Sequence, residues 1–152
     1  MNTAGEEAVL EVLLVEDNPG DVRLTLEAFR EANKSIRLHV AADGVEAMDF
    51  LRGLGAHVNA PRPIFILLDL NLPRMDGREV LAQIKTDDDL KSIPTIILST
   101  SQAEEDVAKC YQLQANCYLT KPARFDAFES TVKIINDFWL QKVKFPASRR
   151  AE

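Results

Sequence analysis

The sequence has few residues of the kinds that mark secreted, membrane-spanning or nucleic-acid-binding proteins. It holds two cysteines and two histidines in 152 residues, which argues against a disulfide framework and against a zinc site. Its longest apolar runs, 12–15 and 64–68, are too short to cross a bilayer, and its polar N-terminus has no export signal. Acidic residues outnumber basic ones by 24 to 18, whereas a nucleic-acid-binding domain normally carries a basic face. These absences favour a cytoplasmic protein that binds neither membrane nor nucleic acid.

What the sequence does contain is the composition of a globular domain. Hydrophobic residues make up 46% and charged residues 28%, which excludes a disordered or fibrous chain. The length fits one domain with a sizeable core. We predict a single domain over residues 9–143, with terminal tails at 1–8 and 144–152 and no separate output domain.

Five short apolar runs alternate with segments of helical periodicity. The runs lie at 12–15, 38–41, 64–68, 95–98 and 117–119. Most are continuous rather than alternating, which is typical of parallel strands covered by helices on both faces. This order predicts an α/β fold, a flavodoxin-like doubly wound sheet of five parallel strands in the order 2-1-3-4-5, with five helices.

Polar side chains stand where these predicted strands end. Glu16 and Asp17 follow the first strand, and Asp69 follows the third. Ser99 ends the fourth strand, and Lys121 follows the fifth. The strands are neighbours in the predicted sheet, and ligands bind outside the carboxyl ends of such strands. We therefore expect these five side chains to share one cleft.

The residue types in this cleft point to phosphoryl transfer. Three carboxylates so close together repel one another unless a cation compensates, and Mg²⁺ prefers oxygen ligands and leaves positions for phosphate oxygens. Lys121 supplies a point charge, and the Ser99 hydroxyl can donate to a phosphoryl oxygen. The set predicts that Asp69 acts as a carboxylate nucleophile and forms an aspartyl phosphate.

Four segments around these residues resemble the response-regulator receiver domain of two-component signalling. They are residues 13–17, 67–77, 94–100 and 118–122, and the resemblance extends over about residues 9–140. Ser99 follows Asp69 by 30 residues and Lys121 follows it by 52, as in typical receivers. The resemblance implies that Asp69 is the phosphoacceptor. It also implies a Mg²⁺ site made by Glu16, Asp17, Asp69 and the backbone carbonyl of Asn71.

The same resemblance assigns roles to the residues after the fourth and fifth strands. Ser99 would be the switch hydroxyl that moves toward the phosphoryl group, and Lys121 would be the cation beside it. Tyr118 would be the aromatic residue whose rotamer follows the switch. The peptide bond between Lys121 and Pro122 would be cis, an isomer found almost only before proline.

A closer resemblance is to single-domain regulators associated with bacterial phytochromes. It is carried by residues 61–63, 68–73, 76–81, 116–121 and 138–140. It implies that the phosphodonor is a sensor histidine kinase, here a bacteriophytochrome.

The last predicted helix carries more apolar residues than one stripe on the sheet requires. Ile134 and Phe138 form a second apolar pair, and Trp139 and Phe145 lie near it in the sequence. Either the chain end folds back over this pair, or the pair is buried in a homodimer through the fourth helix, fifth strand and fifth helix. We favour the homodimer, because exposed apolar patches usually mark interfaces.

Two other functions fit part of the pattern. A Mg²⁺-dependent aspartyl-phosphate phosphatase also uses an aspartate nucleophile, but such enzymes usually carry a second aspartate two positions later, where this chain has Asn71. A binding module that is never phosphorylated would be free to lose the acidic, hydroxyl and lysine residues that are all present here. We therefore expect a phosphoacceptor protein rather than an enzyme.

Overall fold

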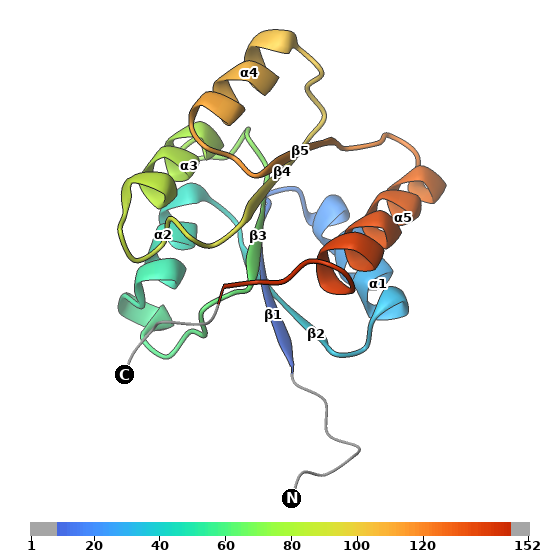
Figure 1. Ribbon diagram of the computed structural model, residues 1–152, viewed down its shortest axis with the longest axis horizontal. Helices are drawn as coiled ribbons and strands as arrows, with labels where there is room; N and C mark the ends of the chain where they lie inside the picture. Colours follow the sequence, from blue (N-terminus) through green and yellow to red (C-terminus); the bar gives the residue numbers. More distant parts are fainter. Residues whose placement is uncertain (1–8, 147–152) are drawn as a thin grey trace, which may run out of the picture.

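The computed structural model describes residues 9–146, which form one five-stranded sheet between two layers of helices (Figure 1). All strand pairs are parallel and the order is β2-β1-β3-β4-β5, which confirms the predicted topology. The strands are β1 (Leu10–Val15), β2 (Ile36–Ala41), β3 (Phe65–Leu68), β4 (Thr95–Ser99) and β5 (Cys117–Thr120).

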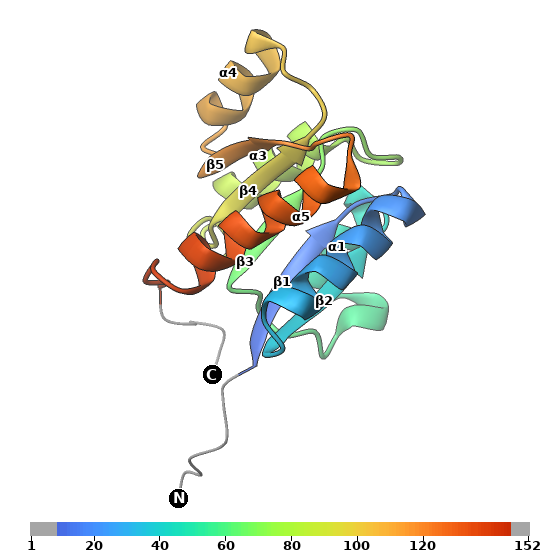
Figure 2. The same ribbon diagram turned by 90° about the vertical axis from the view of Figure 1, so that its right-hand side faces the viewer.

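Five α-helices connect and cover these strands, as predicted. They are α1 (Pro19–Ala32), α2 (Gly44–Arg52), α3 (Gly77–Thr86), α4 (Glu104–Gln112) and α5 (Phe125–Ile134), with a short 3₁₀ turn η1 (Gly55–His57) after α2. Helices α1 and α5 lie together on one face of the sheet, and α2 and α3 lie on the other (Figures 1 and 2). No helix of residues 9–146 is long and apolar enough to cross a membrane.

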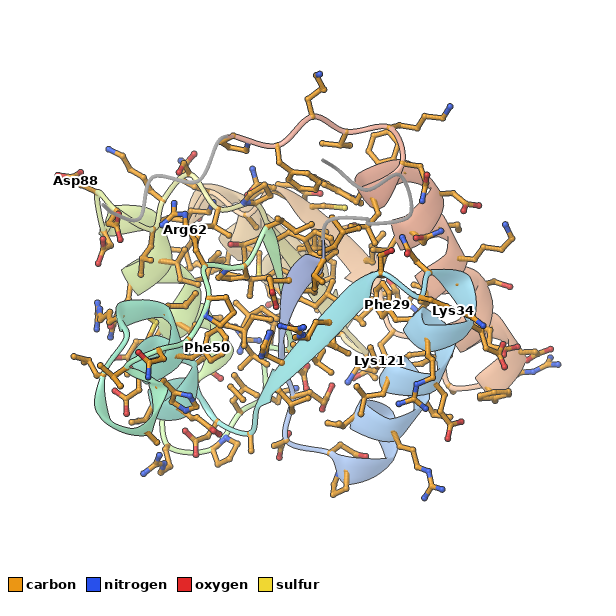
Figure 3. The ribbon with its side chains drawn as sticks, turned by 90° about the horizontal axis from the view of Figure 1, so that it is seen from below. Phe29, Lys34, Phe50, Arg62, Asp88 and Lys121 are labelled. Carbon is orange, nitrogen blue, oxygen red and sulfur yellow. The ribbon has the colours of Figure 1, made fainter. Side chains whose placement is uncertain are left out.

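The two faces of the sheet each carry an apolar core. Phe50 of α2 belongs to one core and Phe29 of α1 to the other, and Figure 3 shows them on opposite sides of the strands. Strand β3 contributes side chains to both cores, because successive side chains of a strand point to opposite faces. All four of its residues are buried. Burial of each large apolar side chain contributes about 1.5–3 kcal/mol. The continuous apolar runs in the sequence reflect this burial on both sides.

Side chains at the helix starts fix the loops that follow the strands. Asn18 Oδ1 accepts from the Asp21 backbone N–H (3.0 Å) at the start of α1, and Asp76 Oδ2 accepts from the Arg78 N–H (3.0 Å) at the start of α3. Such caps stabilise a helix by about 1 kcal/mol each. Both loops begin at strand ends where the sequence predicts chemistry, so the caps help to set that geometry.

The C-terminal part of the described chain differs from a single helix over residues 125–140. Helix α5 ends at Ile134 and passes into a π-helical turn, η2 (Ile135–Leu140). Phe145 then folds back and stacks on Phe65 of β3, with ring centroids 6.0 Å apart, and also lies 6.4 Å from the ring of Trp139. Two of the four residues predicted for a dimer face, Trp139 and Phe145, therefore pack within the chain.

Ile134 and Phe138, the other two residues predicted for a dimer face, remain exposed. Their exposed fractions are 60% and 55%. The domain limits 9–143 stay a prediction, and residues 1–8 and 147–152 of the predicted tails lie outside the described residues.

Gly77 provides a test of how the fold supports the loop after β3. A Cβ atom at this position would meet the Asp69 carbonyl oxygen and come within 2.6 Å of Leu70 Cα. We expect Gly77→Ala to lower the free energy of unfolding by about 2 kcal/mol, because backbone atoms cannot move aside cheaply. Urea denaturation measures this.

Gly20→Ala is the matched control, because Gly20 lies in the first turn of α1 and its nearest contact is the Asn18 side-chain oxygen at 3.2 Å. It should change the stability by less than about 1 kcal/mol. Equal stability of the Gly77→Ala protein and the wild type would contradict the close approach of the two backbones.

Candidate metal and phosphoryl-transfer site

Three carboxylates meet at the carboxyl ends of β1 and β3. Glu16, Asp17 and Asp69 each offer an oxygen atom, and these atoms lie within 4.8 Å of one another. The parallel pairing of β1 with β3 brings them together, and the Asp69 N–H extends this pairing by donating to the Val15 carbonyl (3.0 Å). Glu16 is buried, whereas Asp17 is exposed and faces solvent. An all-oxygen group with one open side suits a hard divalent cation that keeps some of its waters.

The Lys121 ammonium lies against this acidic group. Its Nζ is 2.6 Å from Glu16 Oε1, 3.0 Å from Asp21 Oδ2 and 3.6 Å from Asp69 Oδ2. Only 6% of the Lys121 side chain is exposed, and Figure 3 shows it reaching toward α1. The structure thus brings together four of the five residues predicted at the strand ends and adds Asp21, which the sequence reasoning missed. Asp21 lies in the first turn of α1, five residues after Glu16, and this position is the signal from which it could have been predicted.

Burial and charge set the protonation of this group. Burial raises the pKa of Glu16 above its ordinary value, and the nearby Asp69 charge acts in the same direction against the Lys121 hydrogen bond. Burial by itself would lower the pKa of Lys121, but its hydrogen bonds to Glu16 and Asp21 outweigh this and raise the pKa. Lys121 therefore stays charged, and a further cation would stabilise Glu16 as a carboxylate.

The peptide bond between Lys121 and Pro122 is trans, so the prediction of a cis bond is wrong. The trans isomer is favoured before proline by about 0.5–1 kcal/mol, and the resemblance that implied a cis bond does not outweigh this preference here. The Lys121 N–H donates to the Ser99 carbonyl (2.6 Å), and the side chain reaches the carboxylates with the trans bond in place.

Ser99 and Tyr118 form a second group, centred on Ser101. The buried Ser99 Oγ accepts a hydrogen bond from the Ser101 N–H (3.1 Å), and the Tyr118 hydroxyl donates to the Ser101 carbonyl (2.9 Å). The Tyr118 side chain also packs against the apolar core beneath α2 and α3. Asn71 lies exposed in the loop between β3 and α3, two residues after Asp69. The site therefore combines a charged group with a separately anchored hydroxyl.

Comparison with known proteins agrees with the receiver-domain resemblance over nearly the whole chain. A family model described as the response regulator receiver domain matches residues 12–133. The chain is 47% identical to response regulator Rcp1 of Synechocystis sp., over 90% of this chain and 93% of that protein. It is 40% identical to the probable methanogenesis regulatory protein FilR2 of Methanothrix harundinacea, over 85% and 83% of the two chains.

Solved structures of similar proteins share the fold. The phosphorylated cyanobacterial phytochrome response regulator RcpA superimposes with a TM-score of 0.89 at 47% identity, covering 92% of this chain and all 100% of that one. The Mn²⁺-bound form of Rcp1 gives 0.86 at 47% identity, covering 91% and 99%. RPA3017, a response regulator in red light signaling of R. palustris, gives 0.85 at 31% identity over 91% and 99%.

Lys121 and a bound divalent cation would compete for the same carboxylate oxygens. At an effective dielectric constant near 20, a unit charge about 4 Å away is worth several kcal/mol, so we expect Lys121→Met to bind Mn²⁺ at least about tenfold more tightly. Without metal the same change should lower the free energy of unfolding by about 3 kcal/mol, because it leaves buried Glu16 unpaired. Calorimetric titration and urea denaturation measure the two effects.

Lys91→Met is the matched control for the Lys121 prediction. Lys91 is 56% exposed and pairs with Asp88 away from the acidic group, so its removal should alter neither quantity appreciably. Weaker Mn²⁺ binding by the Lys121→Met protein would show that the lysine does not compete with the metal.

Proposed function

The chain belongs to the response regulator receiver domain family, and from this premise we propose that Asp69 accepts a phosphoryl group from the phosphohistidine of a sensor kinase. The observation that carries the proposal is the convergence of three carboxylates within 4.8 Å beside a buried lysine ammonium. Two contacts support Asp69 as the nucleophile, because its Oδ1 accepts the Leu70 N–H (2.8 Å) and its Oδ2 lies 3.6 Å from Lys121 Nζ.

The proposed reaction exchanges one bond to phosphorus for another. An Asp69 carboxylate oxygen attacks the phosphorus atom, the P–N bond breaks, and its electron pair returns to the imidazole of the kinase. Lys121 then lies beside the transferred group as a fixed positive charge. Ser99 donates a hydrogen bond from its hydroxyl to a phosphoryl oxygen, and the rotamer of Tyr118 follows the segment that carries Ser99.

Receiver domains bind a divalent metal, and the Mn²⁺-bound form of Rcp1 is one solved example among the relatives. We propose Mg²⁺ for this chain, held by Glu16, Asp17, Asp69 and the Asn71 carbonyl. The all-oxygen donor set fits it. When bound, the ion would neutralise charge on the phosphoryl oxygens during transfer.

The proposed phosphodonor is a histidine kinase of the bacteriophytochrome type. The support is the similarity to response regulators whose names place them with phytochromes or red-light signalling. We place the exchange in the cytoplasm, consistent with the free thiols of Cys110 and Cys117.

We further propose that the chain acts as a phosphoacceptor without turnover of an external substrate. Asn71 cannot act as the general acid that an aspartyl-phosphate phosphatase places at that position. A module that is never phosphorylated has no use for the buried ion pair of Lys121 with Glu16.

Replacement of the nucleophile tests the central assignment. Incubation with acetyl phosphate and Mg²⁺ should label the wild-type protein with acid-labile phosphate, and Asp69→Asn should reduce the label to background, because an amide oxygen is a poor nucleophile. The circular dichroism spectrum should stay the same.

Asp126→Asn is the control for the labelling experiment, because Asp126 is 69% exposed at the start of α5, where it pairs with Arg124. It should be labelled like the wild type. Label that persists on Asp69→Asn would refute the assignment of the phosphoacceptor.

We also propose that the chain forms a homodimer through α4, β5 and α5. With Trp139 and Phe145 engaged inside the chain, the support comes from Ile134 and Phe138, two large apolar side chains that are more than half exposed. A soluble domain gains stability when such side chains are covered.

The dimer proposal predicts that Ile134→Ser with Phe138→Ser weakens association at least about tenfold, since buried apolar anchors typically contribute over 1 kcal/mol each. Light scattering at micromolar concentration measures the mass. Leu54→Ser is the control, because Leu54 is similarly exposed (51%) and lies after α2, distant from Ile134 and Phe138 in the sequence. It should leave the dimer intact. A wild-type protein that stays monomeric with and without a phosphoryl mimic would contradict the dimer proposal.

A further inference from the structure

Ser101 takes part in four hydrogen bonds that the proposed reaction does not use, one of them from the Ala103 N–H to its Oγ (3.3 Å). Its Oγ donates to Asp106 Oδ2 (2.6 Å) in the first turn of α4, and its carbonyl accepts from the Tyr118 hydroxyl (2.9 Å). Its N–H donates to Ser99 Oγ (3.1 Å). A residue that joins β4 to α4 is thus fixed to two elements and to the predicted switch hydroxyl at once.

Asp106 is fixed in turn from the side of the phosphoacceptor loop. Arg78 Nη2 donates to Asp106 Oδ1 (2.9 Å), and Arg78 Nη1 donates to Asp76 Oδ2 (3.1 Å). The same Asp76 carboxylate caps α3, which begins directly after the loop that carries Asp69. The hydrogen bond from Ser101 and the one from Arg78 lower the pKa of Asp106, so this carboxylate stays charged and accepts two strong bonds.

This arrangement leaves the proton of the Ser99 hydroxyl available. Its oxygen accepts the Ser101 N–H, and within residues 9–146 it donates no hydrogen bond of its own. The side chain has 0% exposure, so solvent does not compete for the proton. A buried hydroxyl that accepts one hydrogen bond can still turn its proton toward a new acceptor, so Ser99 is available as a donor.

We infer that Arg78, Asp106 and Ser101 are positioning residues that hold Ser99 as a hydrogen-bond donor to the phosphoryl group. The inference rests on the proposed function, because it assumes that a phosphoryl group forms on Asp69. Asp106 and Arg78 touch neither that group nor the metal ligands. They act through Ser101, whose backbone they keep in place against Ser99.

The test is the affinity of the full chain for beryllofluoride at saturating Mg²⁺, measured by calorimetry or NMR. Removal of a supporting bond loosens the donor, so we expect Asp106→Ala to bind beryllofluoride about five- to tenfold more weakly. Its affinity for Mg²⁺ alone should equal that of the wild type. Glu105→Ala removes the same charge from the same turn of α4 at an exposed position, and it should leave both affinities unchanged.

A double-mutant cycle separates positioning from a general loss of stability. In a Ser99→Ala background the donor is already absent, so Asp106→Ala should cause no further loss of beryllofluoride affinity. An equal loss in both backgrounds, an unchanged affinity or a tighter one would overturn the inference. If Asp106→Ala does not fold, Ser101→Ala removes the hydroxyl bond while leaving the Asp106–Arg78 pair, and it should show the same dependence on Ser99.

Failure of the proposed function gives a different pattern. A wild-type protein that binds Mg²⁺ but no beryllofluoride would overturn the proposed function, and this inference with it. A wild-type protein that binds both, with an Asp106→Ala variant that matches it, would overturn the positioning role alone.

Discussion

The buried ammonium of Lys121 is the interaction on which the site depends. Burial of Glu16 next to Asp69 is costly, because each charge loses its hydration and each repels the other. Lys121 offsets this cost by lying 2.6 Å from Glu16 and 3.6 Å from Asp69. Its position follows from the sheet, since the pairing of β5 with β4 places it at the same edge as Ser99. The acidic group can therefore exist before any metal arrives.

The charged group and the hydroxyl of the site are supported by different parts of the fold. Strands β1 and β3, with the first turn of α1, hold the carboxylates around Lys121. Ser99 instead depends on the segment after β4, which Tyr118 and Asp106 hold in place through Ser101. The two supports are joined by the backbone hydrogen bond from the Lys121 N–H to the Ser99 carbonyl (2.6 Å).

The sequence predicts those parts of the site that follow from strand order. Glu16, Asp17, Asp69 and Lys121 stand directly after strands, and the order of parallel strands decides that they meet. Asp21 and Asp106 lie within helices, where many acidic residues are simply solvated, so their contacts depend on side-chain directions that only the structure gives. The cis and trans isomers of the bond before Pro122 differ in free energy by only about 0.5–1 kcal/mol, which is too small a difference to predict from a motif. Of the four apolar C-terminal residues predicted for a dimer face, two pack within the chain because Phe145 folds back onto Phe65. Helical periodicity does not encode such a long-range contact.

The charges of the site also constrain the order of events. Conversion of Asp69 to an aspartyl phosphate adds about one negative charge, because the phosphoryl group carries nearly two and the carboxylate charge is lost. One lysine already faces Glu16, Asp21 and Asp69 at this place. Lys121 alone does not balance the charge of this group, since its Nζ also lies within 3.0 Å of the Glu16 and Asp21 carboxylates. A neutral donor such as Ser99 can stabilise an oxygen but adds no positive charge. A divalent cation at the acidic group would supply the missing positive charge, so the cluster that is costly to keep without metal would favour metal binding and then phosphorylation.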